Sequence, residues 1–268
     1  MFFVGVDCGS RMIKCCLIDR EEDKIVDCYS EDNQQEYEIQ IKKIINKRMK
    51  ACSIREKNIG GIGCTGYGKN NFQNATKYSS EIICHAKGVN YIQNHFSELK
   101  NIKIKTIVDI GGQDSKIIKV ENDCIVLDFV MNDKCAAGTG RFLERVAQLF
   151  NIEISSLGRM SELSDKTIEI NSTCVVFAES EIISYVSMGE KKENIINAVH
   201  RSLIHSVASM NGKIKFDLPI TFVGGVSKNC GMVKSMNEYF NTKVYVPPLS
   251  DMTGAIGAAI SSYDSTNR

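Results

Sequence analysis

Residues 4–18 read VGVDCGSRMIKCCLI, and residues 106–120 read TIVDIGGQDSKIIKV. The two stretches align at a constant offset that places Asp7 on Asp109. Each reads as an apolar strand, a short turn that contains glycine, and a second apolar strand, which is the pattern of a β-hairpin. The chain therefore predicts a hairpin that occurs twice in one fold.

The segments after each hairpin also follow one order. A third strand comes first, then a helix whose apolar residues recur at helical spacing, then an apolar strand that ends in glycines. The three pairs of segments are Lys24–Ser30 and Cys124–Met131, Glu38–Met49 and Arg141–Phe150, and Ile59–Gly63 and Ile220–Gly225. Because the two halves share this order, the sequence predicts an α/β fold of two similar lobes that face one cleft.

The two hairpin turns are candidates for phosphate binding. Asp7 and Asp109 each end a strand and are followed by small residues. Small residues let a phosphate approach the backbone N–H groups, and the carboxylate can hold Mg²⁺ through its waters. A plain tight hairpin explains one such turn equally well. The duplicated occurrence favours two turns that grip one nucleotide.

Composition excludes several classes of partner. The 268 residues include 33 basic and 32 acidic side chains, a formal charge of +1, which gives no electrostatic signature for nucleic acid or a membrane surface. No apolar run reaches the roughly 20 residues needed to cross a bilayer. The first residues read as a strand without the basic region or cleavage pattern of a signal peptide. We expect a cytoplasmic protein.

Eleven cysteines are scattered along the chain. Their odd number and irregular spacing argue against a disulfide framework. No C-x-x-C occurs, so zinc ribbons and ferredoxin-type cluster motifs are not supported. Most of these cysteines lie in apolar strands, where cysteine packs as a small hydrophobic residue. We expect buried packing for all of them except Cys135 and Cys174.

Six unusual strings occur along the chain in a fixed order. They are TGYG at 65–68, DIGGQD at 109–114, NDKCAAGTGRF at 132–142, STCVVFAESE at 172–181, GGV at 224–226 and GAIGAA at 254–259. Together they resemble the BadF/BadG/BcrA/BcrD-type ATPases of the ASKHA superfamily, in particular the small activators of 2-hydroxyacyl-CoA dehydratases. The resemblance covers nearly the whole chain, from Gly5 to Ala259.

The resemblance implies a duplicated actin, Hsp70 and sugar-kinase-like fold, with two ribonuclease H-like lobes around an ATP cleft. Residues 1–102 are expected to form the first lobe, joined by a C-terminal helix at 249–268. Residues 103–248 are expected to form the second lobe, which carries the cluster cysteines.

The resemblance also assigns roles in a site for ATP or ADP with Mg²⁺. Asp7 would orient Mg²⁺ through water, and Asp109 and Gln113 would polarise and position the attacking water. Phosphoryl transfer depends mainly on such positioning and electrostatics. The expected nucleotide-binding residues are Gly9, Ser10, Lys14, Gly111, Gly112, Gly224, Gly225, Lys228 and Asn229. Lys14 and Lys116 could instead be solvated strand lysines.

The chain departs from the family pattern at two positions. Arg11 follows Ser10 where a small hydroxyl residue is usual, and Lys69 follows Gly68 where arginine is usual. The Arg11 guanidinium could bind phosphate directly, or could face solvent and leave that contact weaker.

The resemblance implies a homodimer with one [4Fe–4S] cluster between the subunits, and its ligand positions map onto Cys135 and Cys174. Two cysteines cannot supply four thiolates, so a symmetric dimer is the simple way to reach four. Cys135 precedes a predicted helix, and Cys174 follows a short apolar strand and precedes a helix-like run. A helix N-terminus stabilises a thiolate. Glu179 and Glu181 could contact Mg²⁺, the cluster helix or solvent.

The leading hypothesis is an ATP-dependent electron-transfer activator. Ferredoxin or flavodoxin would donate the electron, and a 2-hydroxyacyl-CoA dehydratase or related iron–sulfur enzyme would accept it. A small-molecule kinase of the same fold without a cluster, a reductase of a double-cubane-cluster protein, and a nucleotide-switched scaffold are the alternatives. The remaining candidates, His200 and His205, are expected to be ordinary histidines with satisfied hydrogen bonds.

Overall fold

The computed structural model describes residues 1–97, 99–171, 174–212 and 214–264, which form two compact α/β units. The first unit contains Met1–Ile102, Asn122–Val126 and Pro247–Arg268, and the second contains Lys103–Glu121 and Leu127–Val246. Residues 122–126 were expected in the second lobe. They cluster with the first unit because the turn η3 (Asn122–Cys124) contacts a helix of that unit, α2 (Glu81–His95).

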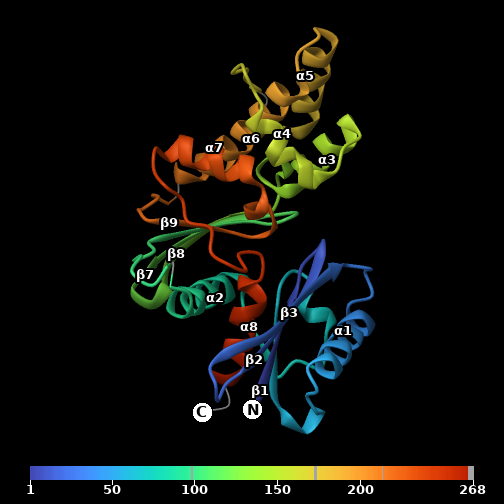
Figure 1. Ribbon diagram of the computed structural model, residues 1–268, viewed down its shortest axis with the longest axis vertical. Helices are drawn as coiled ribbons and strands as arrows, with labels where there is room; N and C mark the ends of the chain where they lie inside the picture. Colours follow the sequence, from blue (N-terminus) through green and yellow to red (C-terminus); the bar gives the residue numbers. More distant parts are fainter. Residues whose placement is uncertain (98, 172–173, 213, 265–268) are drawn as a thin grey trace. The chain divides into compact units, whose positions relative to one another are not determined.

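The first unit is built on a mixed five-stranded sheet (Figure 1). The strand order is β3-β2-β1-β4-β5, with antiparallel pairing from β3 to β1 and parallel pairing from β1 to β5. The strands are β1 (Phe2–Cys8), β2 (Met12–Asp19), β3 (Lys24–Asp32), β4 (Ile59–Thr65) and β5 (Lys77–Tyr78).

Helices cover both faces of this sheet. Side chains alternate along β1, so Val4 and Val6 pack with α1 (Tyr37–Ala51) in the core. On the other face, a Cβ at Gly5 would lie 1.9 Å from the Ala255 carbonyl oxygen of α8 (Thr253–Asp264). Only glycine permits this approach of helix backbone to strand backbone. The last helix of the chain is thus packed directly on its first strand.

The second unit has a four-stranded sheet in the order β8-β7-β6-β9. Its strands are β6 (Thr106–Ile110), β7 (Ser115–Glu121), β8 (Ile125–Asn132) and β9 (Ile220–Val223). β6 pairs with β7 in antiparallel fashion and with β9 in parallel fashion, as β1 does with β2 and β4. The predicted duplication is therefore present in the pairing of the strands.

α-Helices form a layer of the second unit beside its sheet. They are α3 (Gly140–Phe150), α4 (Leu157–Glu162), α5 (Val175–Ser187), α6 (Lys192–Ser209) and α7 (Cys230–Phe240). The core lies between the sheet and this helical layer, and α6 contributes Ile195, Ile196, Val199, Leu203 and Ile204. α5 lies on the side of the helical layer farthest from the sheet (Figure 1). No helix in the described ranges is long and apolar enough to span a bilayer.

Candidate functional site

The first hairpin turn presents a buried aspartate. Asp7 lies in register with Lys14 across β1 and β2, and the Lys14 Nζ is 3.6 Å from the Asp7 Oδ2. Gly66 follows β4 with a φ of 93°, and a Cβ there would lie 2.7 Å from the Asp7 Oδ1. The absence of a side chain at Gly66 therefore leaves room for the Asp7 carboxylate beside the end of β4.

The turn beyond Asp7 is shaped by a residue without a predicted role. The Asn33 Nδ2 donates to the carbonyl oxygens of Gly9 and Ser10, at 3.1 and 3.3 Å. The Asn33 backbone N–H donates to the Arg11 carbonyl oxygen at 2.9 Å. Asn33 is distant in sequence from the turn, so no local pattern identified it. The side chain of Arg11 is exposed.

The second hairpin repeats the arrangement with a more buried lysine. Lys116 has 1% of its surface exposed, and its Nζ lies 3.1 Å from the Asp109 Oδ2 and 2.6 Å from the Asp114 Oδ2. The solvated alternative is therefore wrong for Lys116. Asp114 had no predicted role, although it lies inside one of the six strings.

A glycine also leaves room for the Asp109 carboxylate, as Gly66 does for Asp7. Gly224 follows β9 with a φ of 87°, and a Cβ there would lie 2.4 Å from the Asp109 Oδ1. The duplicated unit is thus an aspartate, a lysine across the hairpin and a glycine at the end of the parallel strand.

The second turn is also joined to α3. The backbone N–H groups of Gly140 and Arg141 donate to the carbonyl oxygens of Gly111 and Gly112, both at 2.9 Å. Gln113 is half-buried in the same turn. The turn that carries Gln113 is therefore joined by backbone hydrogen bonds to the helix that follows Cys135.

The turn predicted to bind nucleotide, Gly224–Asn229, leads from β9 into α7 and is called the nucleotide turn below. Asn229 caps α7, because its side chain accepts from the Met232 N–H at 3.1 Å. The Asn229 Nδ2 donates to the His200 Nε2 at 3.2 Å. Gly225 and Lys228 are exposed. Burial lowers the pKa of His200 to about 3, so the imidazole is neutral and can accept this bond.

Cys135 is exposed and lies in a loop closed by Asn132. The Asn132 side chain donates to the Cys135 carbonyl oxygen at 2.8 Å and accepts from the Cys135 N–H at 3.0 Å. A 3₁₀ turn, η4 (Ala136–Gly138), separates Cys135 from α3. Cys135 is therefore at the start of a helical segment, although not directly at the start of α3.

Cys174 is exposed and directly precedes α5. The apolar strand predicted before it does not form. Ile168 and Ile170 are buried in the core from an irregular segment instead. Glu181 accepts from the Asn171 N–H at 2.9 Å, and Glu179 makes a two-point ion pair with Arg145 at 2.6 and 3.0 Å. Since Arg145 is in α3, this pair joins the helices that follow the two cysteines.

The remaining cysteines mostly pack as predicted. The buried ones are Cys8, Cys15, Cys16, Cys64, Cys84 and Cys124, and the half-buried ones are Cys28 and Cys52. The prediction is wrong for Cys230, which is exposed at the start of α7. Partial burial and the nearby Glu162 raise the pKa of the Cys230 thiol, which disfavours a thiolate there.

The donor set fits one half of a cluster site. Cys135 and Cys174 offer two accessible sulfur ligands from one chain, and an iron–sulfur cluster is held by thiolates. Among the described residues, no group of three or more His, Cys, Asp or Glu side chains could hold a metal ion by itself. A second copy of the chain would supply the missing two thiolates.

A cavity of about 990 Å³ opens beside Cys135 within the second unit. Residues of the β8 end, the irregular segment and α6 line it, including Asn132, Cys135, Glu169, Arg201 and His205. No sequence pattern predicted this cavity, because its walls come from three separate parts of the chain.

Comparison with known proteins identifies close relatives. A family model described as the BadF/BadG/BcrA/BcrD ATPase family matches residues 4–262. The 2-hydroxyisocaproyl-CoA dehydratase activator of Clostridioides difficile is 38% identical over 265 residues, 98% of this chain and 96% of that protein. The (R)-2-hydroxyglutaryl-CoA dehydratase activating ATPase of Acidaminococcus fermentans is 34% identical over 264 residues, 98% and 97% of the two chains.

Solved structures give the same result for the fold. The activator of the 2-hydroxyisocaproyl-CoA dehydratase from Clostridium difficile with bound ADPNP superimposes with a TM-score of 0.89 at 37% identity, covering 100% of this chain and 96% of that one. The ROK hexokinase of Thermus thermophilus has a TM-score of 0.56 at 13% identity over 99% and 100% of the chains, a likeness of fold alone. The predicted actin, Hsp70 and sugar-kinase-like fold is confirmed.

Proposed function

The chain belongs to the BadF/BadG/BcrA/BcrD ATPase family, and on that premise we propose that it is an ATP-hydrolysing electron-transfer activator. Its partner is a 2-hydroxyacyl-CoA dehydratase or a related iron–sulfur enzyme, as the names of its relatives suggest. Ferredoxin or flavodoxin is the proposed electron donor. The two compact units serve as the lobes of the ATPase.

The two Asp–Lys–Gly arrangements support the nucleotide site. In this proposal Asp7 orients Mg²⁺, Asp109 and Gln113 position the attacking water, and the small residues of both turns let the phosphates approach the backbone. Each carboxylate faces a lysine ammonium group, Asp7 that of Lys14 at 3.6 Å and Asp109 that of Lys116 at 3.1 Å. Charged groups held in place before the reaction are what phosphoryl transfer requires.

The observation that carries the electron-transfer part is the pair of exposed cysteines, Cys135 and Cys174, each at the start of a helical segment. The ion pair between Arg145 and Glu179 joins the helices that follow them. When bound, a [4Fe–4S] cluster would store and release single electrons, held by these two thiolates from each of two copies.

The surface of α5 supports the homodimer. Val176 and Phe177, directly after Cys174, are 68% and 67% exposed. Large apolar side chains exposed in one patch are typical of an interaction surface. A two-fold interface at this end of α5 would cover both side chains and bring together cysteines of two copies.

Iron analysis tests the proposal. Purification and reconstitution without oxygen should give about four irons per two chains, with visible absorbance typical of a cluster. Cys135→Ser and Cys174→Ser should each lose most of this iron, whereas Cys230→Ser, the matched exposed control, should keep it. A wild-type protein without iron after reconstitution would contradict electron transfer and favour a kinase of the same fold.

A further inference from the structure

Helix α6 (Lys192–Ser209) contacts each part of the second unit that has a proposed role. It packs against α7 and against η4, the turn after Cys135, and most of its length is buried. Asn194, His200 and Ser206 are three polar side chains of α6 that contact these segments. Packed side chains, hydrogen-bond networks and rigid helices are the elements that carry energetic coupling between distant sites.

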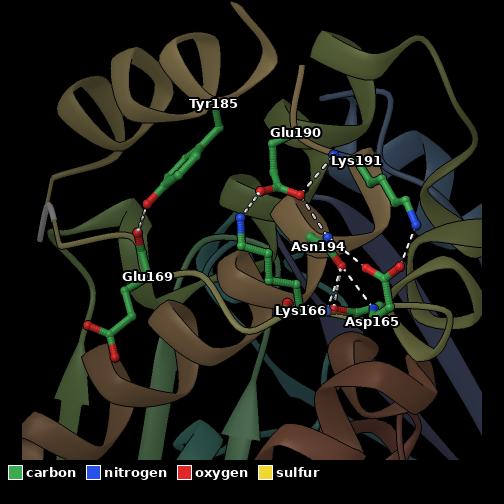
Figure 2. Close-up of polar contacts among 8 residues, drawn as sticks. Asp165, Lys166, Glu169, Tyr185, Glu190, Lys191 and Asn194 are labelled. Carbon is green, nitrogen blue, oxygen red and sulfur yellow. Dashed lines mark hydrogen bonds and ion pairs between the residues drawn. The ribbon is translucent and has the colours of Figure 1, made fainter. Parts of the chain in front are cut away.

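Asn194 holds the irregular segment that leads to Cys174. Its side chain is 1% exposed and lies at the centre of a polar cluster (Figure 2). The Asn194 Oδ1 accepts from the Ser164 hydroxyl at 2.9 Å and from the N–H groups of Asp165 and Lys166 at 3.0 and 3.3 Å. The Asn194 Nδ2 donates to the Asp165 Oδ1 and the Glu190 Oε1, at 3.0 and 2.8 Å. One side chain thus satisfies five partners.

Two exposed ion pairs involve the carboxylates that accept from Asn194. Lys166 pairs with Glu190 at 2.8 Å, and Lys191 pairs with Asp165. Lys166 and Asn194 hold the pKa of Glu190 at about 2, so the carboxylate stays charged at neutral pH. The Tyr185 hydroxyl donates to the Glu169 carbonyl oxygen at 2.9 Å (Figure 2). The segment 164–171 is therefore fixed to α5 and α6 from end to end.

His200 makes the contact with the nucleotide turn. Its Nε2 accepts from Asn229, so the proton of the neutral ring is on Nδ1. That buried Nδ1 has no hydrogen-bond partner among the described residues, contrary to the expectation of a satisfied histidine. An unsatisfied buried donor costs stability. Packing alone therefore does not account for a histidine at position 200. Its hydrogen bond to Asn229 is the polar contact that does.

Ser206 makes the third contact. A Cβ at Gly138 would lie 3.2 Å from the Ser206 Oγ and 3.2 Å from the Asn132 Nδ2. The turn after Cys135 therefore packs on the C-terminal half of α6, beside the side chain that closes the Cys135 loop.

We propose that α6 couples the nucleotide turn to both cysteine segments, with His200 and Asn194 as its positioning residues. This inference rests on the proposed function of the site. A nucleotide that displaces Asn229 also displaces His200, and the helix then carries the shift to Asn194 and the segment before Cys174. Nucleotides change this equilibrium only by binding its two states unequally.

Hydrogen–deuterium exchange measures the coupling whether or not iron is bound. Peptides from 164–171 should exchange at rates that differ at least about fivefold between saturating ADP and a non-hydrolysable ATP analogue. His200→Leu should abolish the difference, because leucine cannot accept from Asn229. His200→Gln should restore it, since the glutamine oxygen can accept. His205→Gln, an exposed position on the same helix, is the matched control and should behave as wild type.

Asn194→Asp tests the other end of α6. A carboxylate cannot donate to Asp165 and Glu190 and would be repelled by both, so the nucleotide-dependent difference should disappear. In iron-loaded protein, the rate of iron loss to a chelator should also stop responding to nucleotide. Asn197→Asp is the control, because among the described residues Asn197 makes a single 3.3 Å hydrogen bond, to the Ser164 hydroxyl.

The outcomes separate the coupling from the proposed function. A nucleotide-dependent exchange difference that His200→Leu removes supports the coupling, even in protein that binds no iron; the absence of iron would then contradict only electron transfer. Iron-loaded wild type without any exchange difference, or a difference that His200→Leu and Asn194→Asp both retain, overturns the coupling.

Discussion

At the scale of the residue, each candidate catalytic aspartate lies against a glycine at the end of a parallel strand. Gly66 and Gly224 have positive φ, and each occupies the space that a side chain would share with a carboxylate oxygen. Strained or restricted backbone of this kind is tolerated where the surrounding structure requires it. Each carboxylate thus occupies space that only a residue without a side chain leaves open.

Gly224→Ala should displace Asp109 and lower the ATPase rate by about 100-fold or more, as expected when a preorganised charge leaves its place. The strained backbone should also destabilise the protein by about 1–3 kcal/mol. Steady-state phosphate release and thermal unfolding measure the two effects. Gly212→Ala is the control, because Gly212 has no proposed role and a Cβ there meets no atom within 4 Å. Equal rates for the two variants would contradict the assigned role of Gly224.

Asp7→Asn should leave nucleotide able to bind but raise the Mg²⁺ concentration needed for half-maximal ATPase activity and lower kcat by about 100-fold. The amide cannot hold the hydrated cation as a carboxylate does. A titration of phosphate release against Mg²⁺ measures this change. Asp19→Asn, at the far end of the hairpin, should match wild type. An unchanged Mg²⁺ response in Asp7→Asn would exclude Asp7 from the metal site.

At the scale of the element, α3 and α5 act as a pair, because Arg145 and Glu179 join them near the two cysteines. Exposed ion pairs add little to stability, so this one is better understood as setting the orientation of two helices.

Arg145→Glu and Glu179→Arg should each leave the melting temperature nearly unchanged but increase the rate of iron loss to a chelator by several-fold. The double variant, in which the charges are exchanged, should recover part of the wild-type rate. Iron release followed by absorbance under anaerobic conditions measures all three. If the double variant loses iron as fast as the two single variants, Arg145 and Glu179 do not act as a pair.

The sequence predicts helices and strands better than it predicts the contacts between residues that are far apart in the chain. The two predicted hairpins form, with Asp7 opposite Lys14 and Asp109 opposite Lys116, because apolar strands and glycine turns are local signals. The helix predicted at 38–49 begins and ends within two residues of α1, since helix ends depend on capping contacts that periodicity does not encode.

The missed features are contacts between distant residues. Asn194 meets partners about thirty residues away, and Arg145 meets Glu179 thirty-four residues away. The strand predicted before Cys174 is absent because Ile168 and Ile170 are buried by the helical layer and not by a sheet. Asn33 and Gly66 were missed for the same reason, because neither role shows in the neighbouring sequence.

At the scale of the whole molecule, one buried histidine gives stability a defined pH dependence. The pKa of His200 is lowered to about 3 in the folded chain, whereas an unfolded histidine titrates near 6.5. The unfolded state alone therefore takes up a proton as pH falls from 6.5 towards 3, so the stabilisation present above pH 6.5 is lost over that window.

Between pH 7 and pH 5, wild type should lose about 2 kcal/mol more of its free energy of unfolding than His200→Gln does. Urea denaturation followed by circular dichroism measures this, because the chain has no tryptophan to report by fluorescence. A parallel loss in both proteins would mean that His200 takes up a proton in the folded state.

Removal of residues 247–268 should unfold the first unit and leave the second largely intact. α8 packs on β1, β2, β4 and α2, so its loss exposes one face of the sheet. Hydrogen–deuterium exchange should show fast exchange in 1–102 and protection in 127–246. Retained protection of β1 in the shortened chain would contradict this account of the core.

The packing of α8 on β1 also has a consequence for synthesis. A ribosome releases the strands of the first unit long before it makes the helix that covers them. At ordinary elongation rates the interval is on the order of ten seconds. During that time the second unit can fold, while the nascent β1 face stays open to chaperones. The strands of the first unit are thus translated well before the helix that completes their core.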